Sequence, residues 1–201
     1  MNLALLMLII LNPFAQVLYL RSLFDQLSFR AFAGVHLRAT LYSFAIFLVF
    51  AMFGDPILHD VFQVRLGSLQ VFGGLVNLYV AYRYITAGEG SVVLFRGDIS
   101  DLAPSITLPY MVGPGMLWVS ILMGRLHHAP VVFLMIGVVL GVNMAFVFAA
   151  RMLFQSAESE RETGFAKSFA VLMRLMALFV GAIGVEMMVG GLQSLLAGAV
   201  G

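Results

Sequence analysis

The chain has 201 residues, of which 62% are hydrophobic and 10% are charged, and its mean hydropathy is +1.02. An average soluble domain is about 45–50% apolar and about 25% charged, so this chain cannot cover its apolar side chains in water. A net charge of +1 gives no reason to expect nucleic acid as a partner, and the absence of cysteine excludes disulfides and thiolate metal sites. The composition predicts an integral membrane protein whose main partner is the lipid bilayer.

Six apolar segments are long enough to cross a bilayer as helices. A spanning helix needs about 20 mostly apolar residues, and such continuous runs lack the ~10-residue alternation of barrel strands. In chain order, the predicted spans are Met1–Leu20, Leu37–Phe53, Leu66–Thr86, Ser105–Gly124, Pro130–Phe154 and Phe169–Ala197. We therefore expect an all-α fold with six transmembrane helices in one domain covering residues 1–201.

Two of these spans are interrupted. Asn12-Pro13-Phe14 lies inside the first span, and Gly113-Pro114-Gly115 lies inside the fourth. Proline removes a backbone donor and clashes with the preceding turn, while glycine loosens the helix further. The sequence therefore predicts a broken first helix and a broken fourth helix, separated by about half the chain.

The order of the spans predicts an inverted repeat. Three spans precede the midpoint and three follow it, so homologous halves of about residues 1–100 and 101–201 would enter the membrane in opposite senses. Inverted repeats with discontinuous helices recur among transporters, with the substrate bound near the midplane where the breaks meet. We expect this 3+3 arrangement here.

Basic residues predict the orientation. They gather in or beside the first, third and fifth connections, as Arg21, Arg30, Arg38, Arg83, Arg96, Arg151, Arg161, Lys167 and Arg174. Only Arg65 and Arg125 lie on the other side. By the positive-inside rule, the larger set faces the cytoplasm and both termini face outward. Arg151 and Arg174 lie near the cytoplasmic boundary, where we expect their side chains to extend to lipid headgroups.

The two breaks are the predicted substrate site. The positive N-terminal end of a half-helix suits a carboxylate, and freed carbonyls suit an ammonium group, so a zwitterionic amino acid fits both. For either break alone, a proline kink without a ligand remains the alternative. The candidate binding residues are Asn12, Pro13, Phe14, Gln16, Thr107, Gly113, Pro114 and Gly115.

Glu186 is the candidate residue for ion coupling. It lies about midway along the sixth span, where an ionised carboxylate is costly, so it must be protonated, paired or hydrated. A titrating carboxylate suits coupling to a proton or sodium gradient. The alternative is a neutral glutamate that hydrogen-bonds a neighbouring helix. Gly137 and Gly141 allow close helix packing, either within the bundle or between two copies in a homo-oligomer.

No motif predicts an enzyme. The sequence contains no Gly-Lys-Ser/Thr phosphate loop and no His-Glu-x-x-His motif, and its four histidines are scattered without ligand spacing. We expect no cofactor and no resident metal, and we do not expect this chain alone to hydrolyse ATP.

Four parts of the chain resemble the MarC family of six-span bacterial inner-membrane proteins, which includes the SnatA-type small neutral amino acid transporters. They are Leu11–Val17, Phe53–Leu58 with Phe72–Gly74, Ser105–Gly115, and Arg174–Leu178 leading to Gly190–Leu192. The resemblance covers nearly the whole chain. It implies a secondary transporter of the lysine-exporter-like superfamily that moves small neutral amino acids, such as glycine or alanine, with an ion gradient.

Two positions depart from the family pattern. Phe14-Ala15 follows Pro13 where the family usually has Leu or Ile and then Gly, and Glu186 stands where Gln is expected. Two other functions therefore stay open: a cation or small-solute carrier or channel centred on Glu186, and a non-transporting membrane subunit.

Overall fold

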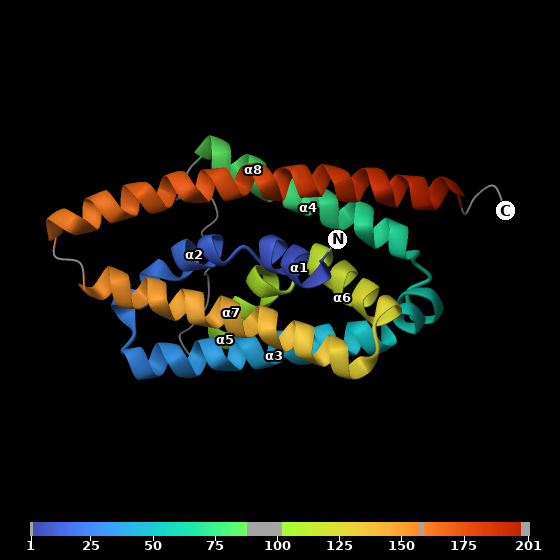
Figure 1. Ribbon diagram of the computed structural model, residues 1–201, viewed down its shortest axis with the longest axis horizontal. Helices are drawn as coiled ribbons and strands as arrows, with labels where there is room; N and C mark the ends of the chain where they lie inside the picture. The colour runs from blue at the N-terminus through green and yellow to red at the C-terminus, as the bar shows by residue number, and fades with distance from the viewer. Residues whose placement is uncertain (1, 88–101, 157–158, 198–201) are drawn as a thin grey trace.

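The computed structural model describes residues 2–87, 102–156 and 159–197, and every regular element within them is a helix (Figure 1). The elements are α1 (Leu3–Leu11), α2 (Pro13–Gln26), α3 (Phe29–Pro56), the π-helix η1 (Ile57–Val61), α4 (Leu66–Ala87), α5 (Leu102–Ser105), the π-helix η4 (Ile106–Met111), α6 (Pro114–Leu126), α7 (Ala129–Ser156) and α8 (Ser159–Ala197). The described part of the chain agrees with the all-α expectation.

Three of the described helices are long and apolar enough to cross a bilayer unbroken. They are Phe29–Val61, which joins α3 to η1, Ala129–Phe154 in α7 and Arg174–Ala197 in α8. The first and fourth predicted spans fall short of this length because each is divided into shorter helices, and the third span, α4, carries polar Gln70, Asn77 and Arg83. Helical structure occurs in all six predicted segments, but the six-span repeat stays a prediction.

The first break depends on the backbone of Asn12. This residue has φ 49° and ψ 74°, a left-handed conformation that asparagine tolerates better than most side chains. Its N–H donates to the carbonyl of Leu8 and closes α1, and its side-chain oxygen accepts the N–H of Ala15 at 3.2 Å and opens α2. Pro13 begins α2, where its missing N–H costs nothing. Asn12 therefore ends one helix and begins the next.

The second break lies between η4 and α6. Leu108 has φ −118° and ψ 122° inside η4, and the chain is extended at Val112 and Gly113. Pro114 then begins α6, again at a position where its missing donor costs nothing. Both interruptions expected from the sequence are present, and the second extends over more residues than the Gly-Pro-Gly motif itself.

Glycines hold α4 and α8 together as a close pair, which lies along one side of the molecule (Figure 1). A β-carbon on Gly74 would overlap the carbonyl oxygen of Gly184, and one on Gly191 would lie 2.7 Å from the carbonyl oxygen of Gly67. The two backbones approach as closely as small residues allow. Helices α1, α2 and α6 lie between this pair and the layer formed by α3, α5 and α7.

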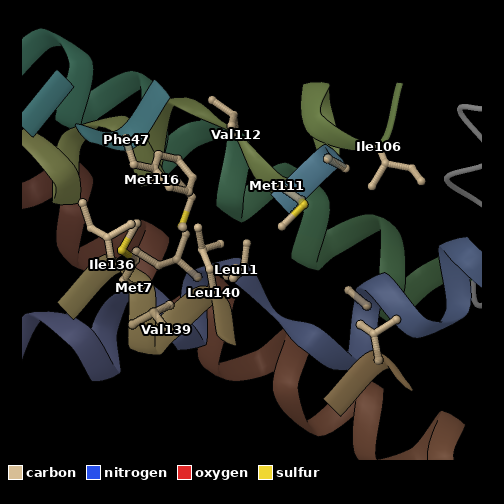
Figure 2. Packing of buried hydrophobic residues seen from close by; sticks show 14 of the residues in the cluster. Met7, Leu11, Phe47, Ile106, Met111, Val112, Met116, Ile136, Val139 and Leu140 are labelled. Atoms are coloured by element: carbon tan, nitrogen blue, oxygen red, sulfur yellow. The ribbon is translucent and has the colours of Figure 1, made fainter. Parts of the chain in front are cut away.

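The apolar core surrounds the first break. Figure 2 shows Met7 and Leu11 of α1 packed among side chains of other helices. Those neighbours are Phe47 of α3, Met116 of α6, and Ile136, Val139 and Leu140 of α7. All of these side chains are buried, so α1 and the break that ends it lie at the centre of the molecule.

Candidate functional site at two helix breaks

The end of α1 meets the start of α6. A β-carbon on Gly115 would lie 3.6 Å from Cγ2 of Ile10 and 3.0 Å from Nδ2 of Asn77. A β-carbon on Gly73 of α4 would lie 2.8 Å from Cα of Gly115. Gly115 therefore lies in close contact with α1 and α4, and a side chain there would press on Asn77. We call residues 10–16 and 113–116, with Asn77 and Asn143, the break site.

Buried amides satisfy part of the backbone that the first break frees. Gln16 is 1% exposed, and its Nε2 donates to the carbonyl of Leu11 at 3.3 Å. Its Oε1 accepts from Nδ2 of Asn143 on α7 at 2.9 Å. The Oδ1 of Asn143 is fully buried and has no hydrogen-bond partner among the described residues. The break site thus holds one acceptor that is not satisfied, which in a native protein calls for an explanation.

Other predicted residues of the first break have structural contacts. The Asn12 side chain is occupied as the cap of α2, and it is 8% exposed. Phe14 is half-buried, and its ring packs edge-on against Phe146 of α7 with centroids 4.6 Å apart. Phe14 therefore joins the break to α7, which accounts for a bulky residue after Pro13.

Thr107 lies against α3. Its side chain is 2% exposed, and its hydroxyl lies within hydrogen-bond distance of the carbonyls of Ala103, at 2.9 Å, and Ala39, at 3.3 Å. Its own carbonyl accepts the N–H of Val112 at 2.8 Å. These contacts fix η4 against α3, so Thr107 holds the second break in place rather than facing the first.

Glu186 is exposed on α8 and has no described contact with either break. The next residue, Met187, is buried, and its sulfur lies 3.6 Å from Nδ2 of Asn77. The side of α8 that faces the break site is thus apolar. Of the predicted site residues, Gly115 of the second break lies against the end of α1, whereas Thr107 and Glu186 lie apart from the first break.

Arg151 corrects an expectation, because its side chain is fully buried instead of extending to headgroups. Its Nη2 donates to the carbonyls of Leu27, at 2.6 Å, and Phe24, at 3.3 Å, and its guanidinium lies 4.6 Å from the ring centroid of Phe32. The last carbonyls of a helix need donors and carry partial negative charge, so the C-terminal end of α2 holds this cation. The expectation failed because the turn after α2 covers Arg151.

His36 is a second buried polar side chain, and it lies near the N-terminal end of α3. Sequence reasoning did not single it out. It is fully buried, its ring stacks on Phe32 with centroids 5.7 Å apart, and neither ring nitrogen has a partner among the described residues. Its position one residue before a predicted span, which begins at Leu37, was the only sequence clue.

A cleft of about 450 Å³ lies at the opposite end of α3. Its lining residues are Asp55, Pro56, Leu58, His59, Asp60, Val64, Arg65, Leu66 and Arg125. Arg125 donates to both carboxylate oxygens of Asp55, and this hydrogen bonding raises the pKa of Arg125, which therefore stays charged. None of the lining residues belongs to the break site. In the described ranges, no group of three His, Cys, Asp or Glu side chains could hold a metal ion.

Comparison with known proteins identifies the family to which the chain belongs. The sequence matches the model for MarC family integral membrane proteins over residues 1–196. The chain belongs to the MarC family. The resemblance carried by the four sequence stretches is thereby confirmed, and this MarC protein is a multi-pass integral membrane protein.

Relatives of this MarC protein occur in bacteria and archaea. A UPF0056 membrane protein of Pyrococcus horikoshii is 27% identical over 190 residues, which cover 94% of this chain and 90% of the relative. The UPF0056 membrane protein YvbG of Bacillus subtilis is 25% identical over 171 residues, covering 79% and 77%. YhcE of Escherichia coli is 27% identical over 168 residues, covering 78% and 74%. No solved structure matches the chain significantly.

Proposed function

We propose that this MarC protein is a secondary active transporter of small neutral amino acids, such as glycine or alanine, in a bacterial inner membrane. The substrate would bind at the break site, and a proton or sodium gradient would drive its movement. The observation that carries this proposal is the meeting of two broken helices at Gly115, beside the partly buried amide of Asn77. The buried amides of Gln16 and Asn143 bond to each other at the first break.

The ends of the two half-helices supply groups for both charges of an amino acid. No side chain caps the start of α6, so its first N–H groups and its positive end suit a carboxylate. Pro13 has no N–H to donate to the carbonyl of Ile9, and that carbonyl suits an ammonium group. The unpartnered Oδ1 of Asn143 is a further acceptor.

The surroundings of the breaks favour a small apolar side chain on the substrate. Ile10 and Met116 flank the place where α1 meets α6, and both are buried. The Gly115 position has no room even for a β-carbon without pressing on Asn77. A bulky or charged substrate side chain would have to displace this packing.

Two long helices support the inverted repeat that this proposal expects. Helices α3 and α7 each have 28 residues, and they begin at Phe29 and Ala129. Their buried positions coincide when the numbering is shifted by about half the chain. The pairs are Phe32 with Val132, His36 with Ile136, Ala39 with Val139, Thr40 with Leu140, Ser43 with Asn143, Phe47 with Val147 and Ala51 with Arg151.

The partners of these long helices also correspond. A β-carbon on Gly124 of α6 would overlap the carbonyl oxygen of Ala51 of α3. At the equivalent place in the other half, Arg151 of α7 donates to the carbonyl of Phe24 of α2. Each long helix thus packs on the broken helix of the other half, as expected for two interleaved repeats around a shared site.

The test is transport by the purified protein in proteoliposomes. We expect uptake or counterflow of labelled glycine or alanine that depends on an imposed proton or sodium gradient. Gly115→Ala should lower the rate roughly tenfold or more, which corresponds to about 1.4 kcal/mol, because its methyl group presses on Asn77. Gly141→Ala is the matched control, because nothing described lies within 4 Å of a β-carbon there.

The proposal fails if no small amino acid moves and none raises the melting temperature of the purified protein, since a ligand of the native state must stabilise it. Glu186→Gln separates the alternative functions. Loss of all flux would favour a carrier or channel centred on this carboxylate, whereas flux that persists without ion dependence would assign Glu186 to coupling alone. Co-purification of a stoichiometric partner without transport would favour a membrane subunit.

A further inference from the structure

Glu186 is placed where a lipid-facing carboxyl group is hardest to accommodate. It lies in the apolar segment Arg174–Ala197 and is exposed on the surface of α8. At the usual helical rise it stands roughly 18 Å from Arg174 and roughly 16 Å from Ala197 along the axis, which is the middle of the segment. Hydrocarbon offers a carboxyl group no hydrogen bond there. A polar partner would satisfy the Glu186 side chain where lipid does not.

Helix α4 cannot cover it. The residues of α8 that pack against α4 include Gly181, Gly184 and Gly191. Glu186 follows Gly184 by two positions, which places it about 200° further round the helix. Figure 1 shows α8 at the edge of the molecule with α4 beside it, and the Glu186 side chain is exposed among the described residues.

The exposed face of α8 has the spacing of a helix–helix contact. We call it the α8 seam, and its members are all exposed: Leu175, Phe179, Ala182, Glu186, Val189, Gln193 and Leu196. They follow one another at alternating steps of four and three residues, the period at which one helix packs along another. Gln193 is a second polar side chain on this seam, and Ala182 is small enough to let a partner helix approach.

We propose that a second copy of this chain packs against the α8 seam, with the two-fold axis along the membrane normal. Such an axis brings the same patch of both copies together and keeps equivalent residues at one depth. A protonated carboxyl group donates through its hydroxyl and accepts through its carbonyl, so Glu186 of one copy complements Glu186 of the other. The seam residues on either side of Glu186 are apolar and cannot hydrogen-bond its carboxyl group. The polar partner at the same depth of the seam is therefore Glu186 of the second copy.

Cross-linking tests the interface directly, because the chain contains no cysteine. With Val189→Cys or Ala182→Cys, mild oxidation in native membranes should give a disulfide-linked dimer. Val138→Cys is the matched control: this residue is also exposed and apolar, but it lies on α7. A dimer cross-linked through Val138→Cys but not through the seam would overturn the proposal.

Association in liposomes, followed by single-molecule photobleaching, tests the role of the carboxyl group. Glu186→Ala should weaken dimerisation about tenfold, because buried polar contacts between membrane helices have this order of strength. Glu186→Gln should retain most of the affinity, since an amide also donates and accepts. A wild-type protein that stays monomeric at all densities, or a different protein recovered stoichiometrically on the seam, would refute the proposal. Neither result depends on transport, so failure here leaves the proposed function untouched.

Discussion

Asn12 shows how much of the break site depends on single side chains. Its backbone takes a left-handed conformation, its N–H closes α1, and its side chain opens α2. Alanine would lose the cap and meet a steric penalty in the left-handed region, whereas glycine would lose only the cap. The two substitutions therefore separate the contribution of the backbone from that of the side chain.

We expect Asn12→Ala to lower the free energy of unfolding by about 2 kcal/mol, the sum of a lost cap and a strained backbone. Asn12→Gly should cost clearly less, because glycine adopts positive φ freely. Reversible unfolding of both variants in mixed micelles measures the difference. Equal destabilisation by the two substitutions would show that the left-handed conformation contributes nothing.

Features that depend on neighbouring residues in the sequence, such as the helix breaks, could be predicted. The burial or exposure of a side chain depends on tertiary packing and could not. Proline in the Asn-Pro and Gly-Pro-Gly motifs removes a backbone donor within its own segment, so both interruptions can be predicted from the local sequence. Arg151 was placed at a membrane boundary because nothing in its own segment shows that the turn after α2 covers it. The exposure of Glu186 likewise depends on which side of α8 its glycines turn toward α4.

At the scale of elements, α3 and α6 pack through glycine at the end that carries the cleft. A β-carbon on Gly124 would overlap the carbonyl oxygen of Ala51, and one on Gly54 would overlap the side chain of Ile121. The Asp55–Arg125 pair lies just beyond these contacts and is about half exposed, so it adds at most about 1 kcal/mol. Close packing of the two backbones, rather than the ion pair, keeps α3 and α6 in contact at this end.

Gly124→Ala should therefore separate α3 from α6 and lower the free energy of unfolding by about 1–3 kcal/mol, the usual cost of overpacking a core. Gly141→Ala should be neutral or slightly stabilising, because its β-carbon meets nothing described and alanine favours helix. Thermal or denaturant unfolding of the two variants in one detergent makes the comparison. Similar stabilities for both would mean that α3 and α6 separate at no cost.

At the scale of the whole molecule, the described connections between long helices lie at two ends. The links that follow η1 and α6 lie at the same end as the C-terminal end of α8, and the link between α2 and α3 lies at the other (Figure 1). This sorting is what the distribution of basic residues requires. The family is established and the helical breaks are present, while the sidedness in the membrane rests on charge alone.

A single cysteine at each end determines the sidedness. We expect His128→Cys, in the link between α6 and α7, to react with a membrane-impermeant maleimide in intact cells, because few basic residues lie on that side. Ala31→Cys, in the first turn of α3, should react only after the cells are opened. Both positions are exposed, so a reversed pattern of labelling would invert the proposed orientation.

Contacts between distant parts of the chain have a consequence for how the protein is made. Arg151 contacts Phe24 across 127 positions, and Arg125 contacts Asp55 across 70. At a synthesis rate of about 5–20 residues per second, several seconds pass between the synthesis of α3 and that of α6. During this time the surface of α3 that later packs against α6 is uncovered. The interval is longer for the C-terminal end of α2, whose contact with Arg151 forms only after α7 has been made. The nascent protein therefore carries two uncovered helix surfaces until α6 and α7 have been made.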